Sequence, residues 1–354
     1  MGHTEARRTN RRRLLRGVAG VAVGVAVAGQ SLRGAAHEGT PTVPTSSVGW
    51  SDDLAVADGR LNVLATVAPI SSIVRNVGGT RIKLRGIVPD GVNSHTFEPA
   101  PSDARTLALA DLIFVNGLGL EAPTIALAAA NLKTGAEIVD LGAQTISPEQ
   151  WLFDFSFPES EGEPNPHLWT NVAFAMRYAE LVYLKLAERD PVNTAAYAHN
   201  LDDYLVVLRR LDEGILAAVR TVPEGNRRLL TFHDSWAYFA PRYGMTVIGA
   251  VQPSDFSEPS PREVAALIDQ IRAEAVPAVF GSEVFESGVL VRIADEGGAL
   301  YVDQLRDDAP PGEVGAPEHT YVGMMLRNME LMVPALGGTI EALAGVPPYD
   351  TYAS

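Results

Sequence analysis

Three histidines occupy positions at which a parallel α/β sheet presents its ligands. They are His95, His167 and His233, and each ends or follows a short apolar run of the kind that forms a buried strand. In open α/β sheets, ligands bind in the crevice beyond the carboxyl ends of the strands. Neutral imidazole is also the commonest metal ligand in proteins. Each histidine taken alone is more often structural, but their shared placement favours a metal site.

One carboxylate at an equivalent position would complete a four-ligand site. Asp303 is the strongest candidate, because it directly follows the apolar run 298–302. Three imidazoles and one carboxylate suit zinc well and are acceptable to manganese or ferrous iron. The chain contains no cysteine, so thiolate ligands are excluded. The sequence thus predicts a divalent metal ion held by nitrogen and oxygen atoms.

The other four histidines are less suited to a shared site. His3 and His37 lie in N-terminal segments that precede the folded part of the chain. His199 stands among acidic residues on a helical stretch, which is typical of a solvated helix face. His319 falls in a loop rich in glycine and proline, where we expect a surface position.

Short apolar runs alternate with longer helical stretches, a pattern typical of parallel sheets covered by helices. The runs form two sets: 61–67, 82–88, 111–116 and 136–141, then 228–232, 245–251, 275–281 and 299–302. A chain of 354 residues is also long enough for more than one core. We therefore expect an α/β fold with two lobes, at 60–189 and 226–345, each with a central, mostly parallel sheet.

A single long helix is predicted at 190–221, between the two sets of strands. Asp190 and Pro191 suit its first turn. Apolar side chains then recur at spacings of three and four and form one stripe, which consists of Tyr197, Leu201, Tyr204, Leu208, Leu211, Ile215 and Val219. At about 1.5 Å per residue the helix would be roughly 45 Å long, enough to connect two lobes as a stiff hinge.

The N-terminal segments indicate export. Residues 1–29 resemble a twin-arginine signal, because a cluster of arginines precedes an apolar stretch at 17–29 that is short for a membrane span. An uncleaved anchor is the alternative, and both place the rest of the chain outside the cytoplasm. Residues 30–58 are rich in glycine, serine, threonine, proline and aspartate, and they are interpreted as a flexible tether.

The net charge of the chain limits the classes of molecule that it can bind. The formal net charge is -15 at pH 7. An acidic protein is a poor partner for nucleic acid or anionic lipid, and it attracts cations. Solubility alone explains the acidity equally well. We therefore expect no nucleic-acid partner, and the charge is compatible with a cation as ligand.

Five segments, in order along the chain, resemble the motifs of one family. The segments are NSHTFEPAPSDARTLALADLIFVNGLGLE at 93–121, NPHLW at 165–169, FHDSWAYFAPRYGM at 232–245, SEPSPREVAALIDQI at 257–271 and LYVD at 300–303. They are similar, in turn, to an HxYEP-x-PSD signature, a DPHVW motif, an HDAxGYF segment, an EPSP helix and the position of an aspartate ligand. The family is that of the metal-specific solute-binding proteins of bacterial zinc and manganese ABC transporters.

This resemblance implies two α/β lobes joined by one long helix, with the metal in the cleft between them. By motif match, His95 and His167 would be ligands from the first lobe, and His233 and Asp303 from the second. The implied function is capture of one divalent transition metal per chain, zinc before manganese, for delivery to the permease of an ABC importer, without catalysis. We expect an exported monomer in the periplasm or on the extracellular face of the cytoplasmic membrane.

Two features depart from the family pattern, and a third bears on the identity of the metal. The loop 149–163 is acidic and lacks the histidines that many zinc-type members carry there, so it either gathers cations weakly or is a solvated surface excursion. Asn165 stands where the family usually has aspartate, and it can support a metal-bound imidazole only as a neutral acceptor. His233 favours zinc, because manganese-type members often place glutamate at that position.

Two other functions fit part of the sequence. A metal-binding surface adhesin, or a metal buffer, could use the same fold. A zinc hydrolase would need an open coordination position and a general base. The sequence has neither an HExxH helix nor a GxSxG elbow, so the hydrolase is the least favoured of the three.

Overall fold

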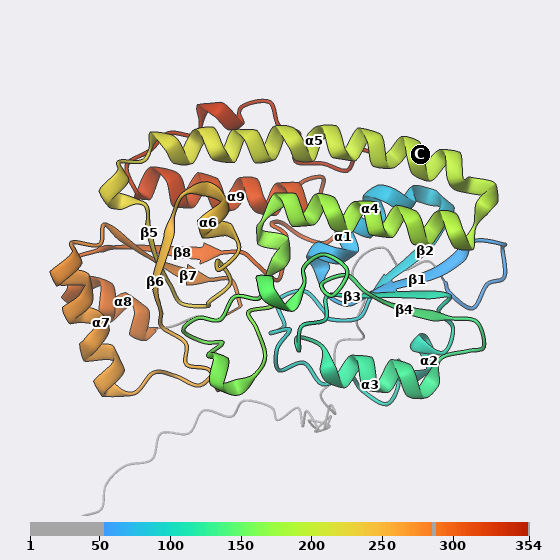
Figure 1. The fold of residues 1–354 in the computed structure, drawn as a ribbon, viewed down its shortest axis with the longest axis horizontal. Coiled ribbons are helices and arrows are strands. Elements are labelled where there is room, and N and C mark those ends of the chain that lie inside the picture. The colour runs from blue at the N-terminus through green and yellow to red at the C-terminus, as the bar shows by residue number, and fades with distance from the viewer. Residues whose placement is uncertain (1–52, 285–287, 353–354) are drawn as a thin grey trace, which may run out of the picture. The chain divides into compact units, whose positions relative to one another are not determined.

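Two four-stranded sheets organise the computed structural model, which describes residues 53–284 and 288–352 (Figure 1). All of the strand pairs in both sheets are parallel. Within these residues, no helix combines the length and the apolar character that a membrane span requires. The predicted signal segment at 1–29 and most of the predicted tether at 30–58 lie outside the described residues.

The first sheet has the strand order β2-β1-β3-β4. Its strands are β1 Leu61–Ala65, β2 Ile82–Gly86, β3 Leu112–Val115 and β4 Glu137–Asp140. Each begins within one residue of the apolar run that predicted it, because strands covered by helices on both faces are rich in apolar residues. The four side chains of β3 are all buried.

The second sheet has the order β6-β5-β7-β8, so β8 lies at an edge. Its strands are β5 Arg228–Thr231, β6 Thr246–Ala250, β7 Ala278–Ser282 and β8 Leu300–Leu305. β8 is longer than the predicted run, which stopped at residue 302. The extension includes a register shift opposite Phe280 and Ser282 and a left-handed residue, Gln304, with φ 64°. Polar residues are tolerated there because an edge strand is partly exposed.

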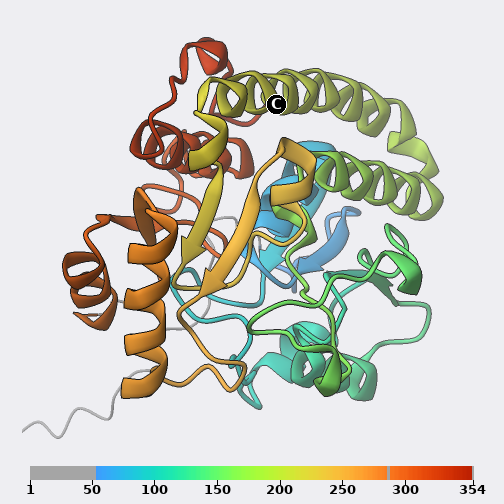
Figure 2. The same cartoon turned by 60° about the vertical axis from the view of Figure 1, so that its left-hand side comes forward.

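Helices cover both faces of the sheets. In Figure 1, α1, α4, α5 and α9 lie above the sheets, whereas α2, α3, α7 and α8 lie below or outside them, and Figure 2 gives the same arrangement from another side. The helices are α1 Ala68–Gly78, α2 Asp103–Leu107, α3 Ala122–Asn131, α4 Val172–Arg189, α5 Thr194–Thr221, α6 Phe239–Tyr243, α7 Pro261–Glu274, α8 Gly288–Gly297 and α9 Tyr321–Ala335.

The predicted long helix is α5, with 28 residues. Every residue of the predicted apolar stripe is buried. The helix begins later than expected, since residues 191–193 form a 3-10 turn. Asp190 supports this turn by accepting hydrogen bonds from Asn193 Nδ2 at 2.6 Å and from the Tyr197 hydroxyl at 2.8 Å. The predicted architecture of two α/β lobes with one long connecting helix is confirmed.

The lobes share a continuous core. One cluster of buried side chains runs from Val63 in the first sheet, through Tyr178 in α4 and Leu208 in α5, to Leu229 and Phe280 in the second sheet. The helical layer therefore holds the two sheets together by packing as well as by chain connection. Because interiors are close-packed, this layer fixes where the loops of one lobe meet those of the other.

The contribution of this helical layer to the stability of the fold can be tested at one buried position of α5. Replacing Leu208, which is fully buried, with alanine is expected to lower the free energy of unfolding by about 2–5 kcal/mol, because it leaves a cavity in the shared core. Val206 lies two residues away on the same helix and is 54% exposed, so its replacement by alanine should change stability by less than about 1 kcal/mol. Urea denaturation of both variants measures the difference, and equal losses would contradict a shared core under α5.

Candidate metal centre

The three predicted histidines meet in the structure. His95 comes from the loop after β2, His167 from the segment before α4, and His233 from the loop after β5. The Nε2 atom of His167 lies 3.1 Å from that of His95 and 3.0 Å from that of His233. A metal-binding atom of each histidine lies within 4.8 Å of those of the other two. Two loops of the first lobe and one of the second thus bring three imidazoles to one point.

The second nitrogen of two of these rings fixes their protonation. His167 Nδ1 lies 2.8 Å from Asn165 Oδ1, and His233 Nδ1 lies 2.7 Å from Gln252 Oε1. An amide oxygen only accepts hydrogen bonds, so each Nδ1 carries the proton and donates it. Burial, before any other cause, lowers the pKa of both His167 and His233 and keeps the rings neutral. Their Nε2 atoms therefore present bare lone pairs to each other.

Asn165 is held in the orientation that this arrangement needs. Its Nδ2 donates to the backbone carbonyl of Asp234 at 2.7 Å and to the carboxylate of Asp154 at 3.2 Å. Its Oδ1 then faces His167 and accepts from both the backbone N–H at 3.1 Å and the ring Nδ1–H. The asparagine thus supports His167 as a neutral acceptor, and its amide group also satisfies the acceptors behind it.

A buried carboxylate, that of Asp307, lies beside two of the three histidines. Its Oδ2 lies 3.3 Å from His233 Nε2 and 3.6 Å from His167 Nε2. This oxygen is buried and has no hydrogen-bond partner among the described residues. Burial, followed by the nearby Glu283 and Asp308, raises the pKa of Asp307. An unsatisfied carboxylate oxygen beside imidazole lone pairs is a donor set that fits a divalent transition metal.

Asp303, the expected fourth ligand, is not in this cluster. Its side chain is exposed and accepts hydrogen bonds from the Tyr301 hydroxyl at 2.9 Å and from the backbone of Gln304 at 2.8 Å. The expectation placed the strand end at residue 302, whereas β8 continues to Leu305. Asp307 is the second residue after the true end of the strand. Leu305, the buried residue at the end of β8, is the feature of the sequence that could have indicated the longer strand.

Glu283 holds the Asp307 loop in place. Its Oε1 accepts hydrogen bonds from three successive backbone N–H groups, those of residues 307–309, each at 3.0 Å. The first lobe holds the same loop: Trp169 Nε1 donates to the Asp307 carbonyl at 2.8 Å, and Ser94 donates to the Asp308 carboxylate at 2.9 Å. The Asp307 carboxylate is therefore positioned by both lobes.

The acidic loop 149–163 is partly enclosed and does not project wholly into solvent. Ser156 donates to Asp234 Oδ2 at 2.9 Å through its backbone and to the Gln252 carbonyl at 2.6 Å through its hydroxyl. Burial and the neighbouring Asp234 raise the pKa of Asp154 to about 9, so these two carboxyl groups share a proton at neutral pH. Part of the loop thus packs against the second lobe beside His233.

Two other histidines, which we expected at the surface, lie outside the cluster. His199 is 65% exposed on α5, as a solvated helix face requires. His319 was expected at the surface, and that expectation is wrong. It is 2% exposed, and its Nε2 lies 3.0 Å from Asp90 Oδ2.

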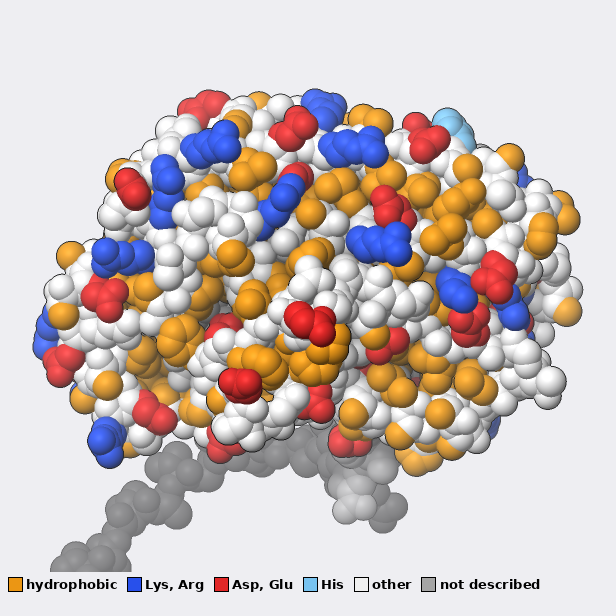
Figure 3. All heavy atoms as spheres, in the orientation of Figure 1, with side chains coloured by type: hydrophobic (Ala, Val, Ile, Leu, Met, Phe, Trp, Pro, Cys, Tyr) orange, Lys and Arg blue, Asp and Glu red, His pale blue; other side chains and the backbone are white. Residues whose placement is uncertain are grey.

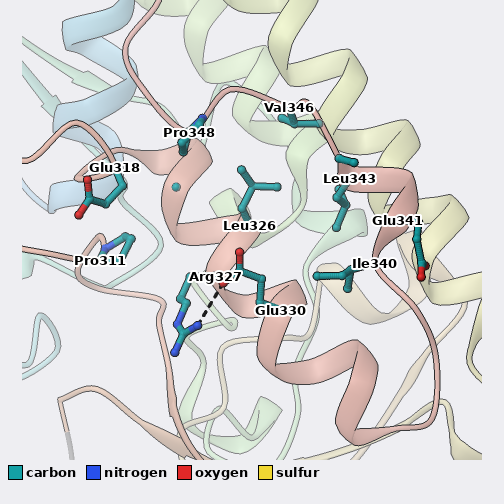
Figure 4. Close-up of a pocket in the computed structure, with 12 residues that line it drawn as sticks. Pro311, Glu318, Leu326, Arg327, Glu330, Ile340, Glu341, Leu343, Val346 and Pro348 are labelled. Carbon is teal, nitrogen blue, oxygen red and sulfur yellow. Dashed lines mark hydrogen bonds and ion pairs between the residues drawn. The ribbon is translucent and has the colours of Figure 1, made fainter.

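A larger cavity, of about 550 Å³, lies away from the histidines (Figure 4). It is formed by α9 and the C-terminal segment, with Leu326, Ile340 and Leu343 among its lining residues. An ion pair between Arg327 and Glu330 lies on one side of it. None of the residues that line it belongs to the histidine cluster, so we assign the candidate metal centre to the cleft and not to this cavity.

The geometry of the site agrees with the similarity of the chain to known proteins. A family model described as "Zinc-uptake complex component A periplasmic" matches residues 63–335, which is more than half of the chain. The chain belongs to this family. Its members are substrate-binding proteins for metal transport, so the chain is a binding protein and not an enzyme.

Similar proteins within this zinc-uptake component family carry different metals in their names. The manganese-binding lipoprotein MntA of Halalkalibacterium halodurans is 29% identical over 276 residues, which cover 78% of this chain and 88% of MntA. The zinc-binding protein TroA of Treponema pallidum is 30% identical over 292 residues, or 80% of this chain and 91% of TroA. A solved structure of periplasmic TroA superposes with a TM-score of 0.70 over 78% of this chain and 99% of that one, at 28% identity.

The role of Asn165 predicts the effect of placing an aspartate there, which is the residue that the resemblance to the family led us to expect. Asn165→Asp replaces an amide donor with a carboxylate oxygen 2.7 Å from the Asp234 carbonyl and next to Asp154. We expect it to lower the unfolding free energy of the metal-free protein by about 1–3 kcal/mol, because buried acceptors would face one another without a proton. Urea denaturation in the presence of a chelator measures this. A stability equal to that of the wild type would show that the amide donor is dispensable.

The buried neutral histidines predict a pH dependence. In the unfolded chain their pKa returns to about 6.5, so below that pH the unfolded state binds more protons than the metal-free fold. The unfolding free energy therefore gains a contribution from these rings that is present above about pH 6.5 and is lost as the pH falls.

Replacing His167 with asparagine should remove one such contribution. The slope of unfolding free energy against pH, below about pH 6.5, is expected to decrease by up to about 1.4 kcal/mol per pH unit. His199→Asn is the matched control, because that ring is 65% exposed, and its slope should equal that of the wild type. Urea denaturation across this pH range, with chelator present, makes the comparison. Parallel curves for the wild type and the His167 variant would contradict a neutral, buried His167.

Proposed function

We propose that this chain is the extracytoplasmic solute-binding component of an ABC importer for a divalent transition metal. In this proposal His95, His167, His233 and Asp307 bind one ion in the cleft between the lobes. The observation that carries it is the convergence of neutral imidazole nitrogens on a carboxylate oxygen that lacks any hydrogen-bond partner among the described residues. A cation is the ligand that removes the repulsion among these lone pairs.

The ligand chemistry favours zinc, with manganese next. Three imidazoles and one carboxylate form a borderline-soft set, which suits zinc, whereas manganese prefers more oxygen ligands. The relatives are named for zinc in one case and manganese in another. The inference for this chain therefore rests on the donor atoms of its own site, and the metal is the transported cargo.

Capture of the ion would link the two lobes. In the proposed division, the lobe at 60–189 supplies His95 and His167, and the lobe at 226–345 supplies His233 and Asp307. An ion held by all four groups bridges the lobes at the cleft, where Ser94 and Asp308 already join them by a hydrogen bond. The permease would recognise this metal-bound arrangement and receive the ion from it.

Capture of the metal takes place outside the cytoplasm. Relatives carry the terms lipoprotein and periplasmic in their names. We propose that the protein works as a monomer, in the periplasm or on the outer face of the cytoplasmic membrane. The ABC permease is its membrane partner.

The deciding experiment compares two aspartates. Calorimetric titration of the purified, metal-free protein with zinc and then manganese, supported by elemental analysis, is expected to give one bound equivalent. Asp307→Ala should weaken binding by at least tenfold, which is about 1.4 kcal/mol, because it removes the anionic ligand. Asp303→Ala is the matched control and should bind like the wild type, since its carboxylate is exposed on β8.

Each outcome bears on a different part of the proposal. Weakening by Asp303→Ala, without an effect of Asp307→Ala, would restore the ligand set expected from the sequence. Failure of the wild-type protein to bind one equivalent of either metal would overturn the capture function itself. A surface adhesin or another role on the same fold would then be the better explanation.

A further inference from the structure

A strained backbone lies beside the candidate metal centre. Four described residues other than glycine have a positive φ. Ala275 ends α7, and Gln304 lies in the irregular part of β8. The other two, Leu118 with φ 53° and Phe256 with φ 57°, line one cavity together with His95. A bulky residue rarely adopts this conformation, and such strain tends to gather at functional sites.

This cavity opens next to the most accessible ligand. Its volume is about 190 Å³, and Glu161 and Glu163 line it along with His95. Both glutamates are exposed, whereas His95 is partly buried and His167 and His233 are buried. Figure 3 shows acidic and hydrophobic side chains, and no basic one, in the part of the surface where the loop 149–163 lies. The cavity therefore offers a cation a path between solvent and His95.

Two phenylalanine rings, one from each lobe, pack against the imidazole of His95. The Phe256 ring stacks on it, with centroids 4.7 Å apart and an interplanar angle of 24°. Phe157 lies 5.5 Å from the His95 ring and 6.1 Å from Phe256. Phe256 belongs to the loop after β6, and Phe157 to the acidic loop of the first lobe. The stack thus covers one face of His95 and joins the lobes at the mouth of the site.

Three contacts hold the segment that leads into Phe256, and one of them closes a turn in which the Phe256 backbone N–H donates to the Pro253 carbonyl at 3.0 Å. Ser254 donates to Glu161 Oε1 at 2.7 Å, and the Gln252 carbonyl accepts from the Ser156 hydroxyl at 2.6 Å. The Ser254 contact is exposed to water, and such exposed contacts are weak. Loss of this contact would remove one restraint on the loop, and a change of Phe256 to a negative φ would take its ring off His95.

We propose that the Phe256 side chain is a gate over His95 that sets the rate at which metal enters and leaves the cleft. This proposal rests on the proposed metal-binding function. The closed position is maintained by stacking on His95 and by the Ser254–Glu161 contact. The open position is favoured by the release of backbone strain. A gate of this kind slows binding and release together, so it changes exchange rates more than affinity.

The test measures zinc exchange by stopped flow, with a chromophoric chelator for release and a metal-sensitive dye for uptake. Phe256→Ala is expected to raise both the association and the dissociation rate constants at least tenfold, while the equilibrium dissociation constant changes less than threefold. Phe155→Ala is the matched control, because this ring from the same acidic loop is 52% exposed. Its rates should equal those of the wild type.

A second variant separates the ring from the backbone. Phe256→Gly removes both the side chain and the left-handed strain, so it should exchange zinc as fast as Phe256→Ala and have a higher melting temperature than that variant. If the alanine variant folds poorly, the glycine variant still allows the exchange rates to be measured without the ring.

Two results would overturn the gate. Unchanged rates in both variants would show that Phe256 does not obstruct exchange. A faster release with an unchanged association rate would show that the ring only supports His95 as a ligand. Absence of zinc binding by the wild-type protein would overturn the proposed function as well, whereas the first two results leave that function intact.

Discussion

The hydrogen bonds from His167 Nδ1 to Asn165 and from His233 Nδ1 to Gln252 are the interactions on which the site depends. They fix which nitrogen of each ring carries the proton and turn the unprotonated nitrogens toward each other, while burial keeps the two rings neutral. This arrangement is unfavourable without a cation, because lone pairs and the oxygen of Asp307 meet in a buried place. In the proposed metal site, the same features favour a divalent ion. The second nitrogen of each ring would then contribute to affinity together with the proposed ligands.

The three imidazoles converge only if loops from two sheets are held close to one another. The packing of the helical layer fixes the relative positions of these loops. The buried stripe of α5 and the packing of α4 and α9 create one core under both sheets. With the carboxyl ends of the strands fixed in this way, the segments that follow them bring three imidazoles together. Glu283 then orders the remaining loop by accepting three backbone hydrogen bonds, which leaves the Asp307 carboxylate facing the histidines.

The sequence predicted the strands and the histidines because both follow local rules. A buried parallel strand is rich in apolar residues, and ligands lie in the segments that follow the carboxyl ends of such strands. The same rule misplaced the aspartate. At an edge strand one side is open to solvent, so Asp303 interrupts the apolar run although the strand continues to Leu305. The stacking of Phe256 on His95 was also beyond prediction, because it joins residues from different lobes and depends on a backbone conformation that no local pattern indicates.

Asn165 illustrates how a departure from a family pattern can be consistent within its own surroundings. Behind this residue lie the Asp234 carbonyl and the carboxyl pair of Asp154 and Asp234, which already share a proton. A further carboxylate at this position would add negative charge to a place that holds it poorly. An amide supplies the acceptor that His167 needs on one side and the donor that the acidic loop needs on the other. The neutral residue and the acidic loop are therefore best understood as one unit, in which the Asn165 amide satisfies both His167 and the loop carboxyl group.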